Sequence, residues 1–134
     1  MRLLLLLLSL LLALPAVAGK TLTPTELSRQ LQAARSPQVL DVRTADEFAR
    51  GHVPGALLIP HDALAAQLDR LDPARPVVLY CRSGRRATIA EAALRERGFE
   101  VSQLQGSFPA WRDAGLPVSC PDAGCASDFE EAPR

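Results

Sequence analysis

The chain lacks an excess of charge of either sign. Its 15 Lys and Arg side chains are matched by 15 Asp and Glu side chains over 134 residues. Proteins that bind nucleic acid or anionic membranes need a basic face, so this balance argues against both as partners. The sequence also has no internal repeat, and its length is that of one ordinary domain with one core. A second domain of ordinary size does not fit.

No apolar run reaches the roughly 20 residues that a transmembrane helix requires. The longest, Leu3–Leu14, is apolar but for one serine and gives way to Pro15. It follows Arg2 and precedes three small residues, the order of a basic n-region, an apolar h-region and a cleavage site. We therefore expect a signal peptide over residues 1–18, cleaved after Ala18. A retained membrane anchor is the alternative.

Cleavage would produce a periplasmic or secreted protein without stable membrane insertion. It would remove 18 of the 134 residues, including Arg2, and leave 116 residues with 14 basic and 15 acidic side chains, a net charge of −1. We expect the folded domain over residues 19–118 and a polar tail over residues 119–134. The one dense basic cluster consists of three arginines that closely follow Cys81.

Cysteine is scarce, with three in the whole chain. An odd number in a secreted protein leaves at least one thiol free or reactive. Cys120 and Cys125 lie five residues apart in the segment CPDAGC, and we expect them to form a local disulfide that leaves Cys81 unpaired. The alternative is that one of them resolves a Cys81 persulfide or pairs with Cys81. Without nearby histidines the two tail thiols make a poor zinc site, and no metal is expected.

Strand and helix patterns alternate along the chain. The segments expected to be strands are 39–42, 56–59, 77–80 and 101–104. The segments expected to be helices are 24–34, which starts with a capping-box pattern, 45–50, 62–71, 87–97 and 109–113. This alternation predicts a three-layer α/β domain with a mostly parallel sheet. The strand at 77–80 is apolar throughout, which suits the centre of such a sheet.

Cys81 follows that central strand, at the sheet edge where α/β proteins bind ligands. The helix expected after the loop CRSGRR turns its N-terminus, with free N–H groups and the positive end of its dipole, toward the sulfur. Gly84 allows the loop to curl tightly. We expect an accessible Cys81 that is largely thiolate and nucleophilic.

Two less specific interpretations compete with this one. A cysteine at a strand end is often a buried apolar side chain. The arginines of the loop could simply be a solvated helix start. Cations at a helix N-terminus oppose the dipole, however, and an anionic ligand would explain why Arg82, Arg85 and Arg86 gather there.

Three stretches together resemble the signature segments of a rhodanese domain. They read DVRTADEFARGHVPGALLIP, VVLYCRSGRRA and LQGSFPAWRDAGLPV, and the likeness spans about residues 22–118. The resemblance implies a five-stranded sheet with helices on both faces. It also implies that Cys81 is the catalytic cysteine and forms a persulfide.

Among proteins that resemble rhodanese domains, the length of the loop after the cysteine distinguishes phosphatases from sulfurtransferases. Phosphatase relatives carry a histidine before the cysteine and an arginine six positions after it, where this chain has Tyr80 and Ala87. Here Arg86 lies five positions after Cys81, the shorter loop that the resemblance associates with sulfur transfer. The charged loop also resembles that of thiosulfate-using rather than mercaptopyruvate-using members, and the arginine fork suits the oxygens of thiosulfate.

The sequence thus predicts a thiosulfate sulfurtransferase that works by double displacement through a Cys81 persulfide. The residues expected to bind the donor are Arg82, Ser83, Gly84, Arg85 and Arg86. The partners expected are a small anionic sulfur donor and a thiophilic acceptor such as cyanide, a small thiol or a protein thiol. Neither a metal nor an organic cofactor is expected, and the protein is expected to be a monomer. The alternatives are a sulfur carrier without turnover and a thiol-disulfide oxidoreductase that uses Cys120 and Cys125.

Several other residues are expected to have structural roles. Arg43 can pair with Glu47 across one helical turn. His52 is expected to be a hydrogen-bonded turn residue, and Trp111 to pack against the sheet. Ser107 stands where the resemblance favours a second glycine, so a positive φ there would strain the loop.

Overall fold

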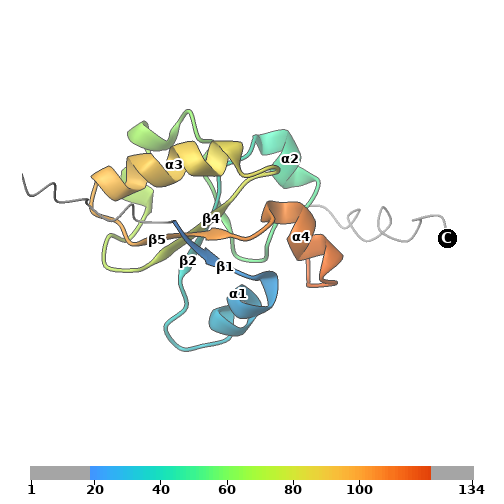
Figure 1. Cartoon of the computed structure of the whole chain (residues 1–134). Coiled ribbons are helices and arrows are strands. Elements are labelled where there is room, and N and C mark those ends of the chain that lie inside the picture. The colour runs from blue at the N-terminus through green and yellow to red at the C-terminus, as the bar shows by residue number, and fades with distance from the viewer. Residues whose placement is uncertain (1–18, 122–134) are drawn as a thin grey trace, which may run out of the picture.

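The computed structural model describes residues 19–121, which form one parallel β-sheet with helices on both faces (Figure 1). The strands are β1 (Lys20–Leu22), β2 (Gln38–Asp41), β3 (Leu57–Leu58), β4 (Val77–Tyr80) and β5 (Val101–Leu104). The helices are α1 (Pro24–Leu31), α2 (Ala45–Ala49), α3 (Arg85–Glu96) and α4 (Ser107–Asp113). The sheet order is β1-β5-β4-β2-β3, and every pair is parallel. The expected three-layer α/β fold is confirmed.

β4 lies at the centre of the sheet and is buried along its whole length. Successive side chains on a strand point to opposite faces. Val77 and Leu79 accordingly belong to the core on one face, and Val78 and Tyr80 to the core on the other. Cys81 continues the alternation and lies in the same core as Val77 and Leu79.

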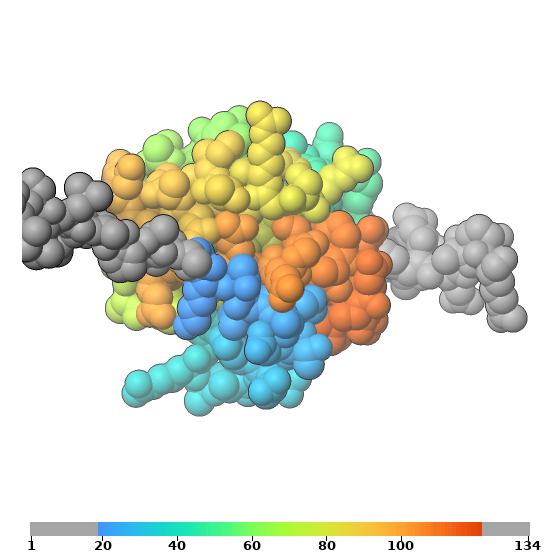
Figure 2. All heavy atoms as spheres, in the orientation of Figure 1, coloured from blue at the N-terminus to red at the C-terminus, as the bar shows by residue number. Residues whose placement is uncertain are grey.

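The helices divide between the two faces (Figure 1). α3 supplies Ala90 and Leu94 to the core that contains Cys81. Leu27 of α1 and Trp111 of α4 belong to the opposite core. Figure 2 shows these two segments side by side, although they come from opposite ends of the domain. Trp111 packs against the sheet as expected, and its indole N–H donates to the carbonyl of Pro117 at 2.8 Å.

The first helix begins with the predicted capping box. The Thr23 hydroxyl accepts a hydrogen bond from the Glu26 amide at 3.2 Å, and the Glu26 carboxylate accepts one from the Thr23 amide at 2.8 Å. These two bonds satisfy donors that the start of a helix otherwise leaves unpaired. The helix ends at Leu31, earlier than the predicted residue 34.

One expectation about secondary structure was wrong, and one strand was missed. The helix expected over residues 62–71 consists of two 3₁₀ turns, η1 (Leu64–Ala66) and η2 (Leu68–Arg70). The Asp62 side chain does not cap the first turn, and Gln67 between the turns is not helical. The leucine spacing resembles the apolar stripe of an α-helix, but two 3₁₀ turns bury the same apolar side chains. The missed strand is β1, whose three residues are too few for a periodic pattern.

The segment after α4 is fixed to the domain by a short bridge. The Ser119 amide donates to the His52 carbonyl at 2.9 Å, and the His52 amide donates to the Ser119 carbonyl at 3.0 Å. The start of the expected tail at residues 119–134 is therefore held against the residues after α2. Among residues 19–121, no helix combines the length and apolar character needed to cross a membrane. The predicted leader at residues 1–18 lies outside the described residues.

Candidate active site

Cys81 stands where the central strand ends and the chain turns into α3. Gly84 is the N-cap of that helix and has a φ of 91°, a region that side chains other than glycine rarely adopt. A Cβ at this position would meet no atom within 4 Å, so the turn requires glycine for its conformation and not for space. The amide of Gly84 donates to the sulfur of Cys81 at 3.0 Å. A donor at this distance stabilises negative charge on the sulfur.

The first turn of α4 holds the backbone of Cys81. The Cys81 amide donates to the Ser107 hydroxyl at 3.4 Å, and the Phe108 amide donates to the Cys81 carbonyl at 3.1 Å. Ser107 is buried and has a φ of 55°, the only positive φ of a residue other than glycine within residues 19–121. The positive φ considered from the sequence is confirmed. The strained serine supplies a hydroxyl that a glycine would lack.

The sulfur is less accessible than the sequence indicated. Cys81 is a free thiol, but it has 0 % of its surface exposed. We expected a sulfur that donors can reach, and the burial of Cys81 corrects this expectation. Arg82 and Ser83, the next two residues, are exposed. In this conformation the buried sulfur thus lies directly beneath an exposed part of the chain.

Arg86 is engaged by a carboxylate from α2. Its two terminal nitrogens donate to the two carboxylate oxygens of Glu47 at 2.7 and 2.8 Å. The hydrogen bonds from Arg86 hold the pKa of the Glu47 carboxyl well below its usual range, and Glu47 in turn raises the pKa of Arg86. The pair ties the start of α3 to the start of α2. Donor binding by Arg86 stays a prediction, as does donor binding by the exposed Arg85.

Arg43 does not pair with Glu47, so that expectation was wrong. Its guanidinium instead bonds the carboxylate of Asp41, with the shortest contact at 2.7 Å, and the carbonyl of Gly51 at 2.7 Å. Burial acts to lower the pKa of Arg43, but the hydrogen bond and charge of Asp41 outweigh it and raise the pKa overall. Two carboxylates thus each hold one arginine, and Arg43 is buried while Arg86 is half-buried.

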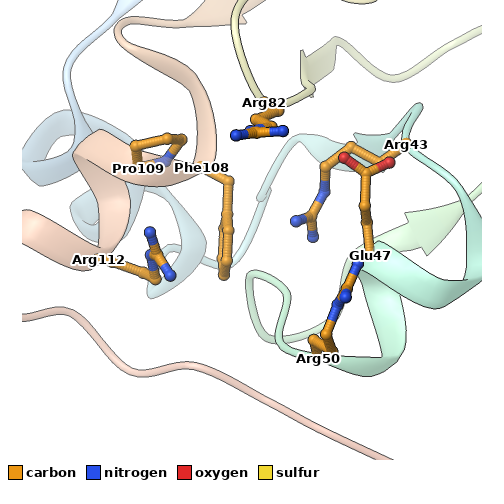
Figure 3. A pocket seen from close by; sticks show the side chains of 7 residues that line it. All are labelled: Arg43, Glu47, Arg50, Arg82, Phe108, Pro109 and Arg112. Atoms are coloured by element: carbon orange, nitrogen blue, oxygen red, sulfur yellow. The ribbon is translucent and has the colours of Figure 1, made fainter. Parts of the chain in front are cut away.

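A pocket of about 370 Å³ opens beside the Cys81 loop (Figure 3). Its lining residues come from the segment before α2, α2 with its C-cap, the Cys81 loop and α4. They are Arg43, Glu47, Arg50, Arg82, Phe108, Pro109 and Arg112. The cavity is thus lined by four arginines and one glutamate, which suits an anionic ligand. Of the arginines singled out from the sequence as donor-binding residues, only Arg82 lines it.

Phe108 forms an apolar surface between two of these arginines. The guanidinium of Arg43 lies 4.3 Å from the centre of the ring, and that of Arg112 lies 5.5 Å from it. Both distances are within the range of cation–π attraction. Figure 3 shows the ring between the two side chains, with Arg82 on the other side of the opening. Sequence analysis missed Arg50 and Arg112, although both lie within the segments that carry the resemblance.

His52 has the structural role that was expected. Its Nδ1 lies 2.9 Å from the carbonyl oxygen of Phe48, and its ring stacks on that of Phe48 with 3.6 Å between the ring centres. The prediction of a hydrogen-bonded residue is confirmed. Within residues 19–121, no group of three or more His, Cys, Asp or Glu side chains is arranged to hold a metal ion.

The tail cysteines fall at the limit of the described chain. Cys120 is disulfide-bonded, whereas Cys81 is not. Cys125 lies outside the described residues, so the pairing of Cys120 with Cys125 stays a prediction.

Comparison with known proteins identifies the family. The model of the rhodanese-like domain matches residues 23–114. The chain belongs to the rhodanese family. A protein named sulfurtransferase from Allochromatium vinosum is 36 % identical over 97 residues, which cover 72 % of this chain and 91 % of the relative. The thiosulfate sulfurtransferase GlpE of Shewanella oneidensis is 36 % identical over 86 residues, covering 63 % of this chain and 85 % of the relative.

Solved structures give the same result for this rhodanese chain. A rhodanese-like domain protein from Staphylococcus aureus superposes with a TM-score of 0.69 at 29 % identity, covering 77 % of this chain and 99 % of that one. A thiosulfate sulfurtransferase from Pseudomonas aeruginosa superposes with a TM-score of 0.71 at 33 % identity, covering 79 % of this chain and 20 % of that one. The fold and the family of sulfurtransferases to which the chain belongs are therefore established.

Replacing Ser107 separates backbone strain from hydrogen bonding. Ser107→Ala keeps the positive φ and leaves the buried Cys81 amide without an acceptor, so we expect the free energy of unfolding to fall by about 1–3 kcal/mol. Ser107→Gly also removes the acceptor but relieves a strain of about 1 kcal/mol, so it should be the more stable of the two variants. Urea unfolding followed by Trp111 fluorescence measures both. An alanine variant as stable as the glycine variant would show that residue 107 is not strained.

The Glu47–Arg86 pair predicts how stability depends on pH. A carboxyl whose pKa is depressed by folding stabilises the protein above its unfolded pKa of about 4.3, and this contribution is lost as the pH falls from there toward the folded-state pKa. Glu47→Gln, which can still form a capping box, should lower the free energy of unfolding by about 1–2 kcal/mol at pH 7. The difference from wild type should shrink steadily below about pH 4.

Denaturant unfolding at a series of pH values tests this expectation. Asp46→Asn is the matched control, because it removes an exposed carboxylate from the same helix turn. Its effect should stay within about 0.5 kcal/mol of wild type. A Glu47→Gln difference that is the same at pH 3 and pH 7 would contradict the assigned role of the pair.

Proposed function

We propose that this rhodanese-family protein is a thiosulfate sulfurtransferase that carries a sulfane sulfur on Cys81. The observation that carries the proposal is the Gly84 amide at 3.0 Å from a free cysteine sulfur, beside a pocket lined by four arginines. The first feature favours an anionic sulfur, and the second favours an anionic donor.

The first half-reaction forms the persulfide. The Cys81 thiolate attacks the sulfane sulfur of thiosulfate, the sulfur–sulfur bond of thiosulfate breaks, and its electron pair leaves with sulfite. The product, a Cys81 persulfide anion, carries the sulfane sulfur at its free end. We assign the stabilisation of its charge to the unpaired amides at the N-terminus of α3, the helix that begins after Gly84. The thiolate is the attacking form of Cys81, so this step itself transfers no proton.

The second half-reaction returns the cysteine. A thiophilic acceptor such as cyanide or a thiol attacks the terminal sulfur, and the electron pair of the persulfide bond returns to Cys81. Arg82 adjoins the nucleophile and lines the pocket, so it is the residue best placed to attract both anionic reactants. Arg86 acts indirectly, because its bond to Glu47 holds the first turn of α3 in position.

Tyr80 argues against phosphatase chemistry. It occupies the position at which the phosphatase relatives carry a histidine, but its side chain lies in the core on the face opposite Cys81. Its hydroxyl accepts a hydrogen bond from the Val53 amide at 3.1 Å, and burial raises the pKa of the phenol. The residue is thus a neutral part of the core.

A sulfur carrier is the second candidate, and the burial of Cys81 favours it. A persulfide formed on a sulfur with 0 % exposure is shielded from small acceptors in solution. Such a protein would accept sulfur and release it only to a partner that opens the loop. The two candidates differ in whether a small acceptor discharges the persulfide.

Replacing the cysteine tests the enzymatic proposal. Wild type incubated with thiosulfate should become one sulfur atom heavier at Cys81, and with cyanide added it should release thiocyanate continuously. Cys81→Ser should do neither, because it lacks the nucleophile. Intact-mass analysis and a thiocyanate assay measure the two steps. A persulfide that forms but resists cyanide would identify a carrier, and no persulfide on a reduced Cys81 would refute both candidates.

The tail cysteines provide the control. Replacing Cys120 and Cys125 together with serine should change thiocyanate formation little, since neither belongs to the Cys81 loop. Loss of activity in this variant, with Cys81 intact, would instead support the thiol-disulfide oxidoreductase considered from the sequence.

We further propose that the protein works in the periplasm or is secreted after cleavage of residues 1–18. The basis is the leader pattern described above. Intact-mass analysis of the protein from a periplasmic extract should show a chain that begins at Gly19. A full-length chain recovered from the membrane fraction would support the retained anchor instead.

A further inference from the structure

The pocket beside the Cys81 loop is larger than the proposed donor requires. The five non-hydrogen atoms of thiosulfate fill on the order of 150 Å³ even at the volume that a water molecule occupies in the liquid. The pocket measures about 370 Å³, a size typical of sites for small organic ligands. Room therefore remains for the carbon skeleton of a second reactant.

The positive charge of this pocket is concentrated at its rim. Arg43 and Glu47 line the pocket, but each is already in an ion pair, with Asp41 and Arg86 respectively. The other three arginines are exposed and come from three different segments, which are the C-cap of α2, the Cys81 loop and α4. They are Arg50, Arg82 and Arg112.

The rim can bind more than one anionic group at once. Arg50 and Arg112 each interact with other parts of the chain. A guanidinium has five N–H donors in a planar fork, so it can hold a carboxylate in addition to such contacts. Figure 3 shows Arg112 on one side of Phe108 and Arg50 on the other.

Phe108 and Pro109 give the pocket an apolar surface between these charges. Phe108 is 5 % exposed, and its ring carries the guanidinium of Arg112. The backbone of Phe108 is joined to that of Cys81, because the Phe108 amide donates to the Cys81 carbonyl at 3.1 Å. A short aliphatic chain lying against Pro109 and the exposed edge of the Phe108 ring would have charged donors at its ends and the Cys81 loop beside it.

We propose that Arg50, Phe108 and Arg112 form an acceptor subsite for small thiols that carry two carboxylates. The inference rests on the proposed function, since it assigns the acceptor of the second half-reaction. The carboxylates bind Arg50 and Arg112, and the carbon skeleton packs against Pro109 and the exposed edge of Phe108. Arg82 follows Cys81 directly in the chain and lines the same pocket, so it offsets the repulsion between the two reacting anions.

The reaction at this subsite is a transfer of one neutral sulfur atom. The acceptor thiolate attacks the terminal sulfur of the Cys81 persulfide and forms a new sulfur–sulfur bond. The bond between that sulfur and Sγ breaks, and its electron pair stays on Cys81. The products are an acceptor persulfide anion and the Cys81 thiolate, so charge is conserved and no external oxidant or reductant is needed.

Single-turnover discharge of the loaded protein tests the subsite. Protein carrying the Cys81 persulfide is mixed with mercaptosuccinate, 2-mercaptoethanol or cyanide, with the two thiols at equal thiolate concentration, and the loss of one sulfur atom is followed by intact mass. Mercaptosuccinate should discharge wild type about tenfold faster than 2-mercaptoethanol, the effect expected of charge-assisted hydrogen bonds. The doubly substituted protein with Arg50→Gln and Arg112→Gln should lose this preference. The ratio of its discharge rates by 2-mercaptoethanol and cyanide, two acceptors without carboxylates, should change far less than the ratio for mercaptosuccinate and 2-mercaptoethanol.

Arg97→Gln is the matched control. It removes an exposed arginine at the C-cap of α3, the end of that helix away from the Cys81 loop. It should keep the preference for mercaptosuccinate, which separates a local subsite from the effect of net charge. Equal rates for the two thiols in wild type, or an unchanged preference in the double variant, would overturn the proposal.

Failure of the proposed function gives a different result. If thiosulfate does not load Cys81, the persulfide is generated with polysulfide and the same discharge series is measured. If neither loads it, S-methylmercaptosuccinate is titrated into wild type and the amide signals of Phe108 and of residues 110–112 are followed by NMR. Shifts that disappear in the double variant support the subsite. An absence of shifts overturns it independently of the chemistry at Cys81.

Discussion

The hydrogen bond from the Gly84 amide to the Cys81 sulfur is the interaction on which the rest of the site depends. It requires a left-handed glycine, and this turn starts α3 at the next residue. The start of α3 in turn places Arg86 where Glu47 can bind both of its terminal nitrogens. One turn of backbone thus orients the sulfur, the helix N-terminus and the link between α2 and α3.

A second set of hydrogen bonds holds the main chain of Cys81. Its amide donates to Ser107 and its carbonyl accepts from Phe108, the first two residues of α4. The backbone strain of the positive φ at Ser107 is tolerated because the Ser107 hydroxyl accepts a hydrogen bond from the Cys81 amide. Without this bond the amide would be a buried donor without a partner. This contact also brings Phe108, and with it the surface of α4, to the mouth of the site. The geometry of the nucleophile and the shape of the pocket therefore have a common origin.

Sequence patterns were sufficient where the signal is local. The unbroken apolar run of β4 predicted the central strand, and the position of Cys81 followed from it. The capping box of α1 was confirmed because its partners lie three residues apart. β1 is only three residues long, and its place beside β5 depends on residues about 80 positions away in the chain.

The ion-pair partners of Arg43 and Glu47 could not be predicted either, because they depend on how distant parts of the chain meet. Glu47 was expected to bind Arg43, four residues earlier, but it binds Arg86, which is 39 residues away, while Arg43 turns to Asp41. Both exchanges depend on how the loops meet at the carboxyl edge of the sheet. The roles of Arg50 and Arg112 at the rim could not be predicted either, since only the folded chain brings α2 and α4 to the same pocket. The burial of Cys81 also follows from packing that no local pattern records.

The division of charge between core and rim bears on how a buried sulfur can serve a transfer reaction. Arginines nearest the core are neutralised by carboxylates, so they stabilise the fold and hold the loop without binding a reactant tightly. Positive charge that is exposed lies further out, at Arg82 and beyond, where it attracts anions by long-range attraction. In the proposed reaction an anion must both enter and leave at each step, sulfite in the first and the acceptor persulfide in the second. Strong charge beside the sulfur would slow release, whereas charge at the rim speeds entry and exposes the departing anion to competition from water and salt.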